Sequence, residues 1–284
     1  MIPEREKGRR LGETRRAASE TDCREKALAI LRVRPSGIFV DIDGTLSPIV
    51  SIPEEARVLP ASRQALRDLA SLVDLVVIIS GRRVDDARGM VGLDDIAYFG
   101  NHGLERWDAA NGYRSRAEQY RARVLTALAA LERRLAALPG VRLEDKKTVI
   151  SIHYRLAAEP AEARRAILEA AAVVGEEASL TVTEGKKVVE LRPPLSIDKG
   201  TTLETAIREN GLRGVLCLGD DLTDAAAFRA LRKLREQGAV EGLAIGVGGE
   251  ETPAELSAAA DALLAGPNEV ATFLQQLAAA LERW

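Results

Sequence analysis

Short apolar runs separated by amphipathic stretches recur along much of this chain. The stretches, such as residues 60–72 and 221–234, place leucine and alanine at helical spacing. The runs are rich in β-branched and aromatic residues and have the length of buried strands; they cover residues 37–42 (GIFVDI), 75–79 (LVVII), 96–99 (IAYF), 215–218 (VLCL) and 243–245. Strands that alternate with helices predict an α/β fold, a parallel sheet with helices on both faces.

The middle of the chain has a different pattern. A long helix is expected over residues 117–138 and a second one over residues 160–174. Each is followed by two short strand-like stretches, at residues 141–143, 148–153, 180–183 and 187–191. Two strand pairs with two helices are typical of an α+β unit. We therefore expect an inserted domain at residues 105–195, within a core formed by residues 36–104 and 196–284.

The composition excludes several classes of protein. The 284 residues carry 40 Lys and Arg against 43 Asp and Glu, a net charge of −3, and only 4% aromatic residues. A nucleic-acid binder usually shows a basic face or stacking aromatic side chains, so no nucleic-acid partner is expected. No apolar run approaches the roughly 20 residues that span a bilayer, and no secretory signal is evident, so we expect no membrane partner and a cytoplasmic location.

The two cysteines and the charged N-terminal segment do not indicate a catalytic or metal site. Cys23 and Cys217 lie far apart in the sequence, which suggests neither a disulfide framework nor a thiolate metal site. Residues 1–34 hold ten Lys or Arg against six Asp or Glu. We therefore expect residues 1–35 to form a solvated, charged tail or helix that precedes the folded domain, with a docking segment as the alternative.

Asp41 and Asp43 lie where the first apolar run ends and precede Gly44, which allows a tight turn. Two residues apart in an extended chain, their side chains lean to the same side. Ligands bind at the carboxyl ends of strands in open α/β sheets, so the two acids lie where a site is expected.

A second acidic cluster follows another apolar run and contains Asp220, Asp221 and Asp224. One such turn alone is more often a helix N-cap than a metal site. Two clusters after neighbouring strands would bring several carboxylates together, where they repel each other unless a cation is present. Oxygen ligands of this kind favour a hard ion such as Mg²⁺, although Mn²⁺ accepts the same ligands.

Candidate phosphate-binding groups lie at two other positions. The Ser80-Gly81-Arg82 turn ends a third strand and offers a hydroxyl and backbone N–H groups, although an ordinary strand-to-helix turn is equally compatible. Lys199 opens a helix that runs to about residue 210, where Thr201 with Glu204 fits a capping box. With only two histidines and no nucleophilic-serine, P-loop or dinucleotide motif, an aspartate is the remaining candidate nucleophile.

These residues, in this order, resemble the four motifs of the haloacid dehalogenase phosphohydrolase superfamily. Further stretches, GNHGLE (100–105), EDK (144–146) with SIHYR (151–155), GKKVVELRP (185–193) and GDDLTD (219–224), resemble the trehalose-6-phosphate phosphatase family. The resemblance covers about residues 36–283. It implies a Rossmann-like core with a mobile α/β cap, and hydrolysis of trehalose 6-phosphate in trehalose biosynthesis.

The same resemblance implies roles for individual residues. Asp41 would be the nucleophile that forms an aspartyl-phosphate, Asp43 the general acid and then base, and Ser80 and Lys199 would hold the phosphoryl oxygens. Mg²⁺ would be bound by Asp41, the Asp43 carbonyl oxygen and Asp220, with Asp221 and Asp224 in support. Contacts to the sugar phosphate are expected from Arg82, Asn101, His102, Glu144, Lys146, Lys187 and Glu190.

Three points stay open at this stage. His102 is compatible with a substrate contact or a loop scaffold, and the family usually has Glu where this chain has Ala225. The substrate could be another sugar phosphate, such as sucrose 6-phosphate, glucosylglycerol phosphate or mannosyl-3-phosphoglycerate. A catalytically silent partner of a trehalose-phosphate synthase would be expected to have damaged catalytic acids, and none is visible, while association with such a synthase stays open.

Overall fold

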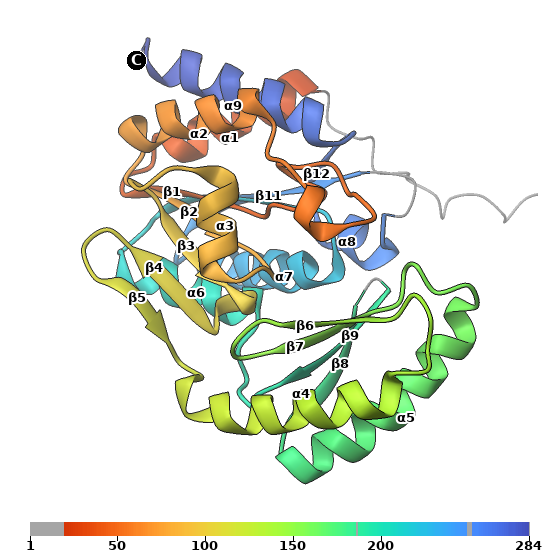
Figure 1. Ribbon diagram of the computed structural model, residues 1–284. Coiled ribbons are helices and arrows are strands. Elements are labelled where there is room, and N and C mark those ends of the chain that lie inside the picture. The colour runs from red at the N-terminus through yellow and green to blue at the C-terminus, as the bar shows by residue number, and fades with distance from the viewer. Residues whose placement is uncertain (1–19, 186, 249–251, 284) are drawn as a thin grey trace, which may run out of the picture.

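The computed structural model describes residues 20–185, 187–248 and 252–283. Within these ranges the named strands form one sheet of eight strands and one of four. Figure 1 shows the larger sheet between two layers of helices, with the smaller sheet and its two helices beside it. No helix in the described ranges is long and apolar enough to cross a membrane.

The larger sheet has the strand order β12-β11-β10-β1-β2-β3-β4-β5. Six neighbouring strands are parallel: β1 (Ser36–Val40), β2 (Leu75–Ile79), β3 (Ala97–Gly100), β10 (Gly214–Gly219), β11 (Glu241–Val247) and β12 (Ala262–Leu264). The hairpin β4 (Glu105–Asp108) and β5 (Gly112–Ser115) extends the sheet in antiparallel direction. The five apolar runs expected as strands are therefore strands, and the predicted parallel sheet is confirmed.

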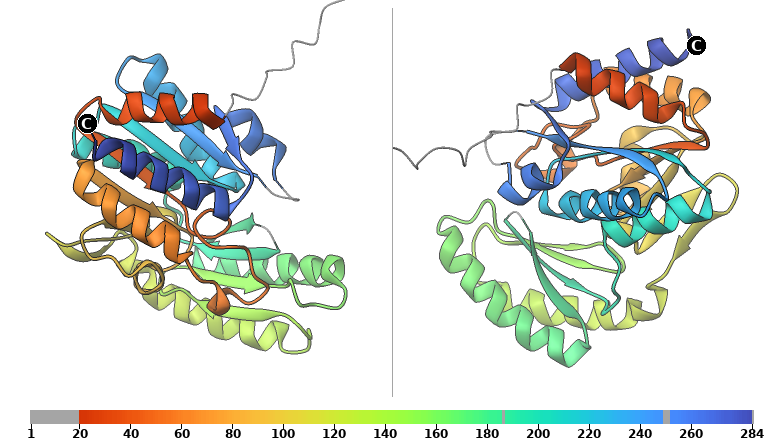
Figure 2. Two further views of the ribbon diagram at one scale, coloured as in Figure 1. Left: turned by 90° about the horizontal axis from the view of Figure 1, so that it is seen from above. Right: turned by 180° about the vertical axis from the view of Figure 1, so that it is seen from behind.

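Both faces of this sheet are buried under helices. Successive residues of β1 point to opposite faces, so Ile38 and Val40 pack in one core cluster and Phe39 packs in the other. The first cluster includes side chains of α1 (Glu20–Leu31), α2 (Pro60–Leu72), α3 (Val84–Val91) and α9 (Pro267–Leu281), and the second those of α6 (Lys199–Glu209), α7 (Leu222–Glu236) and α8 (Ala254–Ala259). Figure 2 shows α1, α9 and α2 (red, dark blue and orange) side by side over one face.

The smaller unit is an antiparallel sheet with the order β6-β7-β9-β8. Its strands are β6 (Arg142–Asp145), β7 (Ile150–His153), β8 (Thr181–Gly185) and β9 (Val188–Arg192). The helices α4 (Arg121–Leu135) and α5 (Pro160–Ala178) cover its outer face with a separate core that includes Leu131, Ile152 and Ile167. Its inner face is turned toward the larger unit (Figure 1). The pattern of two helices and two strand pairs matches the expectation for this part of the chain.

Three details differ from the sequence-based expectations. The β4–β5 hairpin pairs with β3 in the larger sheet, so the predicted insert boundary at residue 105 includes two strands of that sheet. Residues 1–35 were expected to form a solvated, charged tail or helix; they contain the helix α1, but its Cys23, Ala27 and Leu31 are buried against the sheet, while residues 1–19 lie outside the described part. The α6 capping box is formed by Asp198 and Thr201 rather than by Thr201 and Glu204.

Candidate active site

Three neighbouring strands of the larger sheet end at one point. The parallel pairing of β1 with β10 and with β2 brings Asp41, Asp220 and Ser80 to the same edge. The backbone N–H of Asp41 continues the ladder by donating to the Leu218 carbonyl at 3.1 Å. The candidate residues after these strands therefore lie together, as the sequence predicted for an open α/β sheet.

Lys199 lies beneath the candidate nucleophile at the first turn of α6. Its Nζ is 3.1 Å from Asp41 Oδ1 and 2.8 Å from Asp224 Oδ1, and the side chain is only 2% exposed. Burial acts against the charged amine, but Asp224 and Asp41 outweigh it and hold the pKa of Lys199 well above its ordinary value. Lys199 is thus a fixed positive charge next to Asp41.

One cation does not balance the carboxylates around it. Oxygen atoms of Asp41, Asp220 and Asp224 all lie within 4.8 Å of one another. Burial, with mutual repulsion and only partly offset by Lys199, raises the pKa of both Asp41 and Asp220 to about 8. Both carboxyl groups therefore favour the protonated form near pH 7 unless a further positive charge lies beside them.

The residues fit a divalent cation. Asp220 Oδ1 is buried, and no hydrogen-bond partner reaches it from the described residues. Gly44 leaves room for that carboxylate, because a Cβ at Gly44 would lie 2.0 Å from Asp220 Oδ2, and its φ of +84° also favours glycine. An unpartnered buried oxygen beside a second carboxylate is the ligand set expected for a hard ion.

The other two aspartates of this loop, Asp221 and Asp224, accept hydrogen bonds that stabilise the start of α7 and the position of Lys199. Asp221 is the N-cap of α7, where its Oδ1 accepts hydrogen bonds from Thr223 N and Asp224 N. Burial acts to raise its pKa, but Lys199 and side-chain hydrogen bonds with Asp224 and Thr223 outweigh it, so the pKa of Asp221 is lowered. Asp224 Oδ1 accepts from Lys199, and its Oδ2 accepts from the N–H groups of Asp220 and Asp221. Both residues are therefore better placed to support the metal loop than to bind an ion directly.

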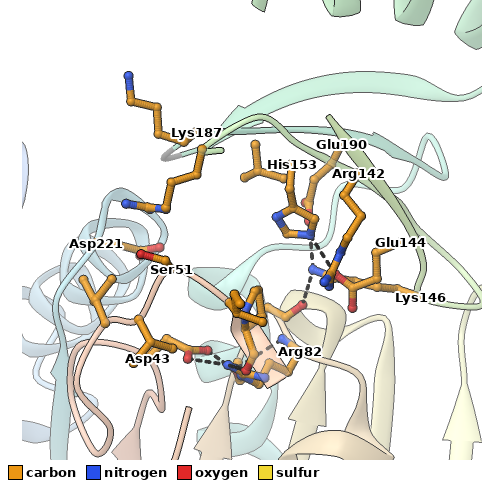
Figure 3. A pocket seen from close by; sticks show the side chains of 18 of the residues that line it. Asp43, Ser51, Arg82, Arg142, Glu144, Lys146, His153, Lys187, Glu190 and Asp221 are labelled. Carbon is orange, nitrogen blue, oxygen red and sulfur yellow. Dashed lines mark hydrogen bonds and ion pairs between the residues drawn. The ribbon is translucent and has the colours of Figure 1, made fainter. Parts of the chain in front are cut away.

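The candidate general acid is held by an arginine. Arg82 donates from Nε and from one terminal nitrogen to the two oxygens of Asp43, at 2.7 Å each, and also to the Pro53 carbonyl at 2.9 Å (Figure 3). Ser80 Oγ accepts the backbone N–H of Arg82 at 3.2 Å, and Ser80 is 1% exposed. Arg82, expected to contact substrate, therefore positions Asp43 in this conformation.

A cavity of about 270 Å³ lies between this edge of the larger sheet and the inner face of the smaller one. Its lining includes all but two of the sequence-predicted site residues: Asp41, Asp43, Ser80, Arg82, His102, Glu144, Lys146, Lys187, Glu190, Lys199, Asp220 and Asp221. The two that do not line it are Asp224, described above, and Asn101.

The smaller sheet presents alternating charges to this cavity (Figure 3). Glu144 accepts a 2.8 Å hydrogen bond or ion pair from His153, and the pKa of Glu144 is lowered, since His153 and Lys146 together outweigh the effect of burial. Lys146 Nζ lies 3.3 Å from Glu190 Oε1 and 3.2 Å from the Gly81 carbonyl. Lys187 is an exposed side chain at the rim.

Glu190 is ionised despite its burial. The effect of burial on its pKa is outweighed by Lys146, His102 and the Ser151 hydroxyl, which donates at 2.7 Å, and the pKa falls to about 2. Burial lowers the pKa of His102 to about 4, so this imidazole is neutral near pH 7, at 3.8 Å from Glu190. Neutral and charged donors and acceptors thus face the cavity, as recognition of a ligand rich in hydroxyl groups requires.

Asn101 lies outside the cavity. It is 1% exposed, and its amide donates at 3.0 Å to Glu105, to Thr148 and to the Lys146 carbonyl. In this conformation the Asn101 side chain joins the two units, through Thr148 and the Lys146 carbonyl of the smaller one and Glu105 of the larger one.

Several lining residues were not among the sequence-based candidates. Arg142 precedes Glu144 by two positions on β6, so the period-two alternation of a strand could have indicated it. It forms an ion pair across the mouth of the cavity with Glu54, which belongs to the short 3₁₀ helix Pro53–Glu55. The loop residues Ile49 and Ser51 also line the cavity, and no motif marks them.

Comparison of the sequence with known proteins identifies the family of this chain. The model of the trehalose-phosphatase family matches residues 39–261. The chain belongs to this family. A trehalose-phosphate phosphatase of Mycolicibacterium paratuberculosis is 37% identical over 260 residues, which cover 88% of this chain and 64% of that protein. The chain thus spans less than two thirds of that member of the trehalose-phosphatase family.

Solved structures support the fold. The C-terminal domain of a Candida albicans trehalose-6-phosphate phosphatase aligns with a TM-score of 0.74 at 24% identity, covering 90% of this chain and 96% of that domain. A haloacid dehalogenase-like hydrolase of Bacteroides thetaiotaomicron aligns with a TM-score of 0.61 at 14% identity, covering 88% and 99%. Like these proteins, this trehalose-phosphatase family member has an α/β fold, in which a largely parallel sheet lies between two layers of helices.

Proposed function

We propose that this protein hydrolyses trehalose 6-phosphate to trehalose and inorganic phosphate, through an aspartyl-phosphate on Asp41. The observation that carries the proposal is that two groups of residues face each other across one cavity. One is the buried Asp41–Lys199 ion pair, and the other contains the charged side chains of Glu144, Lys146 and Glu190. The first suits phosphoryl transfer, and the second suits a ligand rich in hydroxyl groups.

In the first half of the reaction, an Asp41 carboxylate oxygen attacks phosphorus. The bond between phosphorus and the sugar oxygen breaks, and Asp43 gives its proton to that oxygen. In the second half, Asp43 takes a proton from a water molecule that attacks phosphorus, and the bond to Asp41 breaks to release phosphate. Lys199 and the Ser80 hydroxyl hold the phosphoryl oxygens while negative charge moves between them.

Asp41, the Asp43 carbonyl oxygen and Asp220 would hold Mg²⁺, with Asp224 and Asp221 shaping the loop around it. The ion would supply charge that keeps Asp41 ionised and neutralises the phosphoryl group. The unpartnered Asp220 oxygen and the raised pKa of Asp41 support this assignment.

In this proposal the larger unit carries out catalysis and the smaller unit binds the sugar. We assign residues 36–116 and 196–283 to the catalytic core and residues 117–195 to a cap, since the β4–β5 hairpin belongs to the larger sheet. Glu144, Lys146, Lys187 and Glu190 of the cap would bind the sugar hydroxyls. Cys23 and Cys217 are both buried free thiols, in keeping with a cytoplasmic location for this reaction.

Phosphate release from a panel of sugar phosphates tests the proposal. The panel contains trehalose 6-phosphate, sucrose 6-phosphate, glucose 6-phosphate and mannosyl-3-phosphoglycerate, each with Mg²⁺ or EDTA. We expect EDTA-sensitive release with a strong preference for trehalose 6-phosphate. Preference for another member would retain the Asp41 chemistry and overturn the assignment of the cap residues, whereas no release from any member would overturn the proposed activity.

A further inference from the structure

The turn between β6 and β7 is docked on the larger unit. Lys147, at its tip, has a left-handed backbone with φ of +64°, and its Nζ lies 3.0 Å from Asp85 in the first turn of α3. The preceding residue, Lys146, reaches the Gly81 carbonyl with its Nζ at 3.2 Å. The position of this turn therefore decides whether Lys146 lies over the cavity.

Asn101 holds the turn from below. Its Nδ2 donates to the Lys146 carbonyl and to Thr148 Oγ1, both at 3.0 Å, and to Glu105 Oε1 at the same distance. Asn101, Glu105 and Thr148 are each 1% exposed, so water cannot replace these contacts in this conformation. A buried amide left without partners is costly, which makes the network sensitive to the loss of any member.

The same short segment is also bonded to the loop after β2. Asn101 N donates to the Arg82 carbonyl at 2.7 Å, and His102 N donates to the Ser80 carbonyl at 2.9 Å. Glu105 Oε2 accepts the N–H of Val84, the first residue of α3, at 3.0 Å. Residues 101–105 are thus bonded both to the Ser80–Arg82 loop, which is proposed to hold the phosphoryl group, and to the turn that carries Lys146.

The backbone at this point is strained. Asn101 and His102 have φ values of +48° and +58°, and two consecutive left-handed residues other than glycine are uncommon. Such a conformation persists only where the surroundings enforce it, here through the backbone and side-chain hydrogen bonds of Asn101 and Glu105. The conformation turns the Asn101 side chain away from the cavity and toward the cap.

We propose that Asn101, supported by Glu105, is a positioning residue that couples the docking of the cap turn to the Ser80–Arg82 loop, so that Lys146 closes on the sugar when the phosphoryl group is held. Asn101 itself touches no substrate. The inference rests on the proposed function, because it assigns Lys146 to sugar binding. It differs from a direct sugar contact in that the effect passes through the Lys146 carbonyl and Thr148.

Three variants test the coupling: Asn101→Ala, Thr148→Val, which keeps the side-chain volume, and the double variant. A matched control is Asn111→Ala, whose exposed amide bonds only within the β4–β5 turn, to Asp108. If the docked turn is less populated, KM for trehalose 6-phosphate rises in proportion while saturating substrate restores kcat. We expect KM to rise about tenfold with kcat changed less than threefold in each single variant, and the double variant to be no worse than the more affected single one.

Amide hydrogen exchange of the full chain without substrate provides a readout that does not depend on activity. The amides of residues 146–149 should exchange faster in Asn101→Ala and Thr148→Val, and remain unchanged in Asn111→Ala. A fall in kcat at unchanged KM, additive effects on KM, or unchanged exchange would overturn the coupling. Faster exchange in a protein that does not hydrolyse trehalose 6-phosphate would support the coupled turn and overturn the proposed function instead.

Discussion

Arg82 engages both carboxylate oxygens of Asp43 at 2.7 Å and anchors itself on the Pro53 carbonyl. The next residue, Glu54, is paired with Arg142 of the cap. A continuous chain of contacts therefore runs from β6 of the cap to the candidate general acid. Because Arg82 is held at both ends, it fixes the direction of the Asp43 side chain.

Removing this clamp should slow the reaction through Asp43. We expect Arg82→Ala to lower kcat about 10- to 100-fold, as for the loss of hydrogen bonds to a charged group. Asp43→Asn should lower it further, and the double variant should be no slower than Asp43→Asn alone. Steady-state kinetics on the four proteins measures this, and independent, multiplicative losses would show that Arg82 does not act through Asp43.

Removing the charge of Asp220 should have opposite effects on the stability of the metal-free protein and on Mg²⁺ binding. Asp220→Asn relieves repulsion, so the metal-free variant should be at least as stable as the wild-type protein at pH 7.5. It should also lose the rise in melting temperature that Mg²⁺ gives the wild-type protein, a rise that corresponds to about 2.7 kcal/mol at an ion concentration 100 times Kd. Thermal unfolding with Mg²⁺ or EDTA measures both, and an equal Mg²⁺ effect in the two proteins would exclude Asp220 as a ligand.

The pKa of Glu190, about 2, predicts a pH-dependent contribution to stability. A carboxyl group whose folded-state pKa is depressed stabilises the fold above its unfolded value, near 4.5, and loses this contribution as the pH falls toward 2. With 10% side-chain exposure, and with His102 neutral at this pH, the contribution of Glu190 at pH 6 is at most of the order of a few kcal/mol.

The difference in unfolding free energy between wild type and Glu190→Gln should therefore be largest at pH 6 and shrink as the pH falls from about 4.5 toward 3. Urea unfolding at pH 6, 4.5 and 3.5 measures it. The matched control is Glu184→Gln, on the adjacent strand β8, where an exposed pair with Arg164 contributes little. A difference in unfolding free energy that stays constant over this pH range would contradict a stabilising ion pair between Glu190 and Lys146.

Much of the fold and of the site followed from local patterns. The β2 and α2 ranges were predicted end to end, because five β-branched or leucine residues mark one and Pro60 at the first turn marks the other. Asp41, Ser80 and Asp220 could be brought together because the carboxyl ends of neighbouring parallel strands meet at one edge. These predictions need no knowledge of distant contacts.

The remaining features depend on contacts that the local sequence does not encode. The β4–β5 hairpin could belong to either sheet until its pairing with β3 is known. The mixed charges around Cys23 and Ala27 conceal a narrow apolar stripe that becomes visible only when α1 packs on the sheet. Asn101 looks like a polar ligand in the sequence, and only its left-handed backbone turns it toward the cap.

Ala225 provides a further test of the packing around the acidic loop. It is fully buried in the core cluster between α6, α7 and the sheet, at a position where the resemblance seen in the sequence implies Glu. We expect Ala225→Glu to destabilise this chain by several kcal/mol, because the new carboxylate would be buried without a partner, and to leave activity no higher. Urea unfolding measures this against the exposed control Ala258→Glu, and equal stability of the two variants would contradict it.

The central claim is that Asp41 attacks the phosphoryl group of trehalose 6-phosphate. Its most direct test is phosphate release from this substrate by the wild-type protein and by Asp41→Asn, at equal protein and Mg²⁺ concentrations and with matched folding by thermal melting. We predict rapid release by the wild-type protein and a loss of at least about a thousand-fold in the variant. Comparable release by the two proteins would contradict the account.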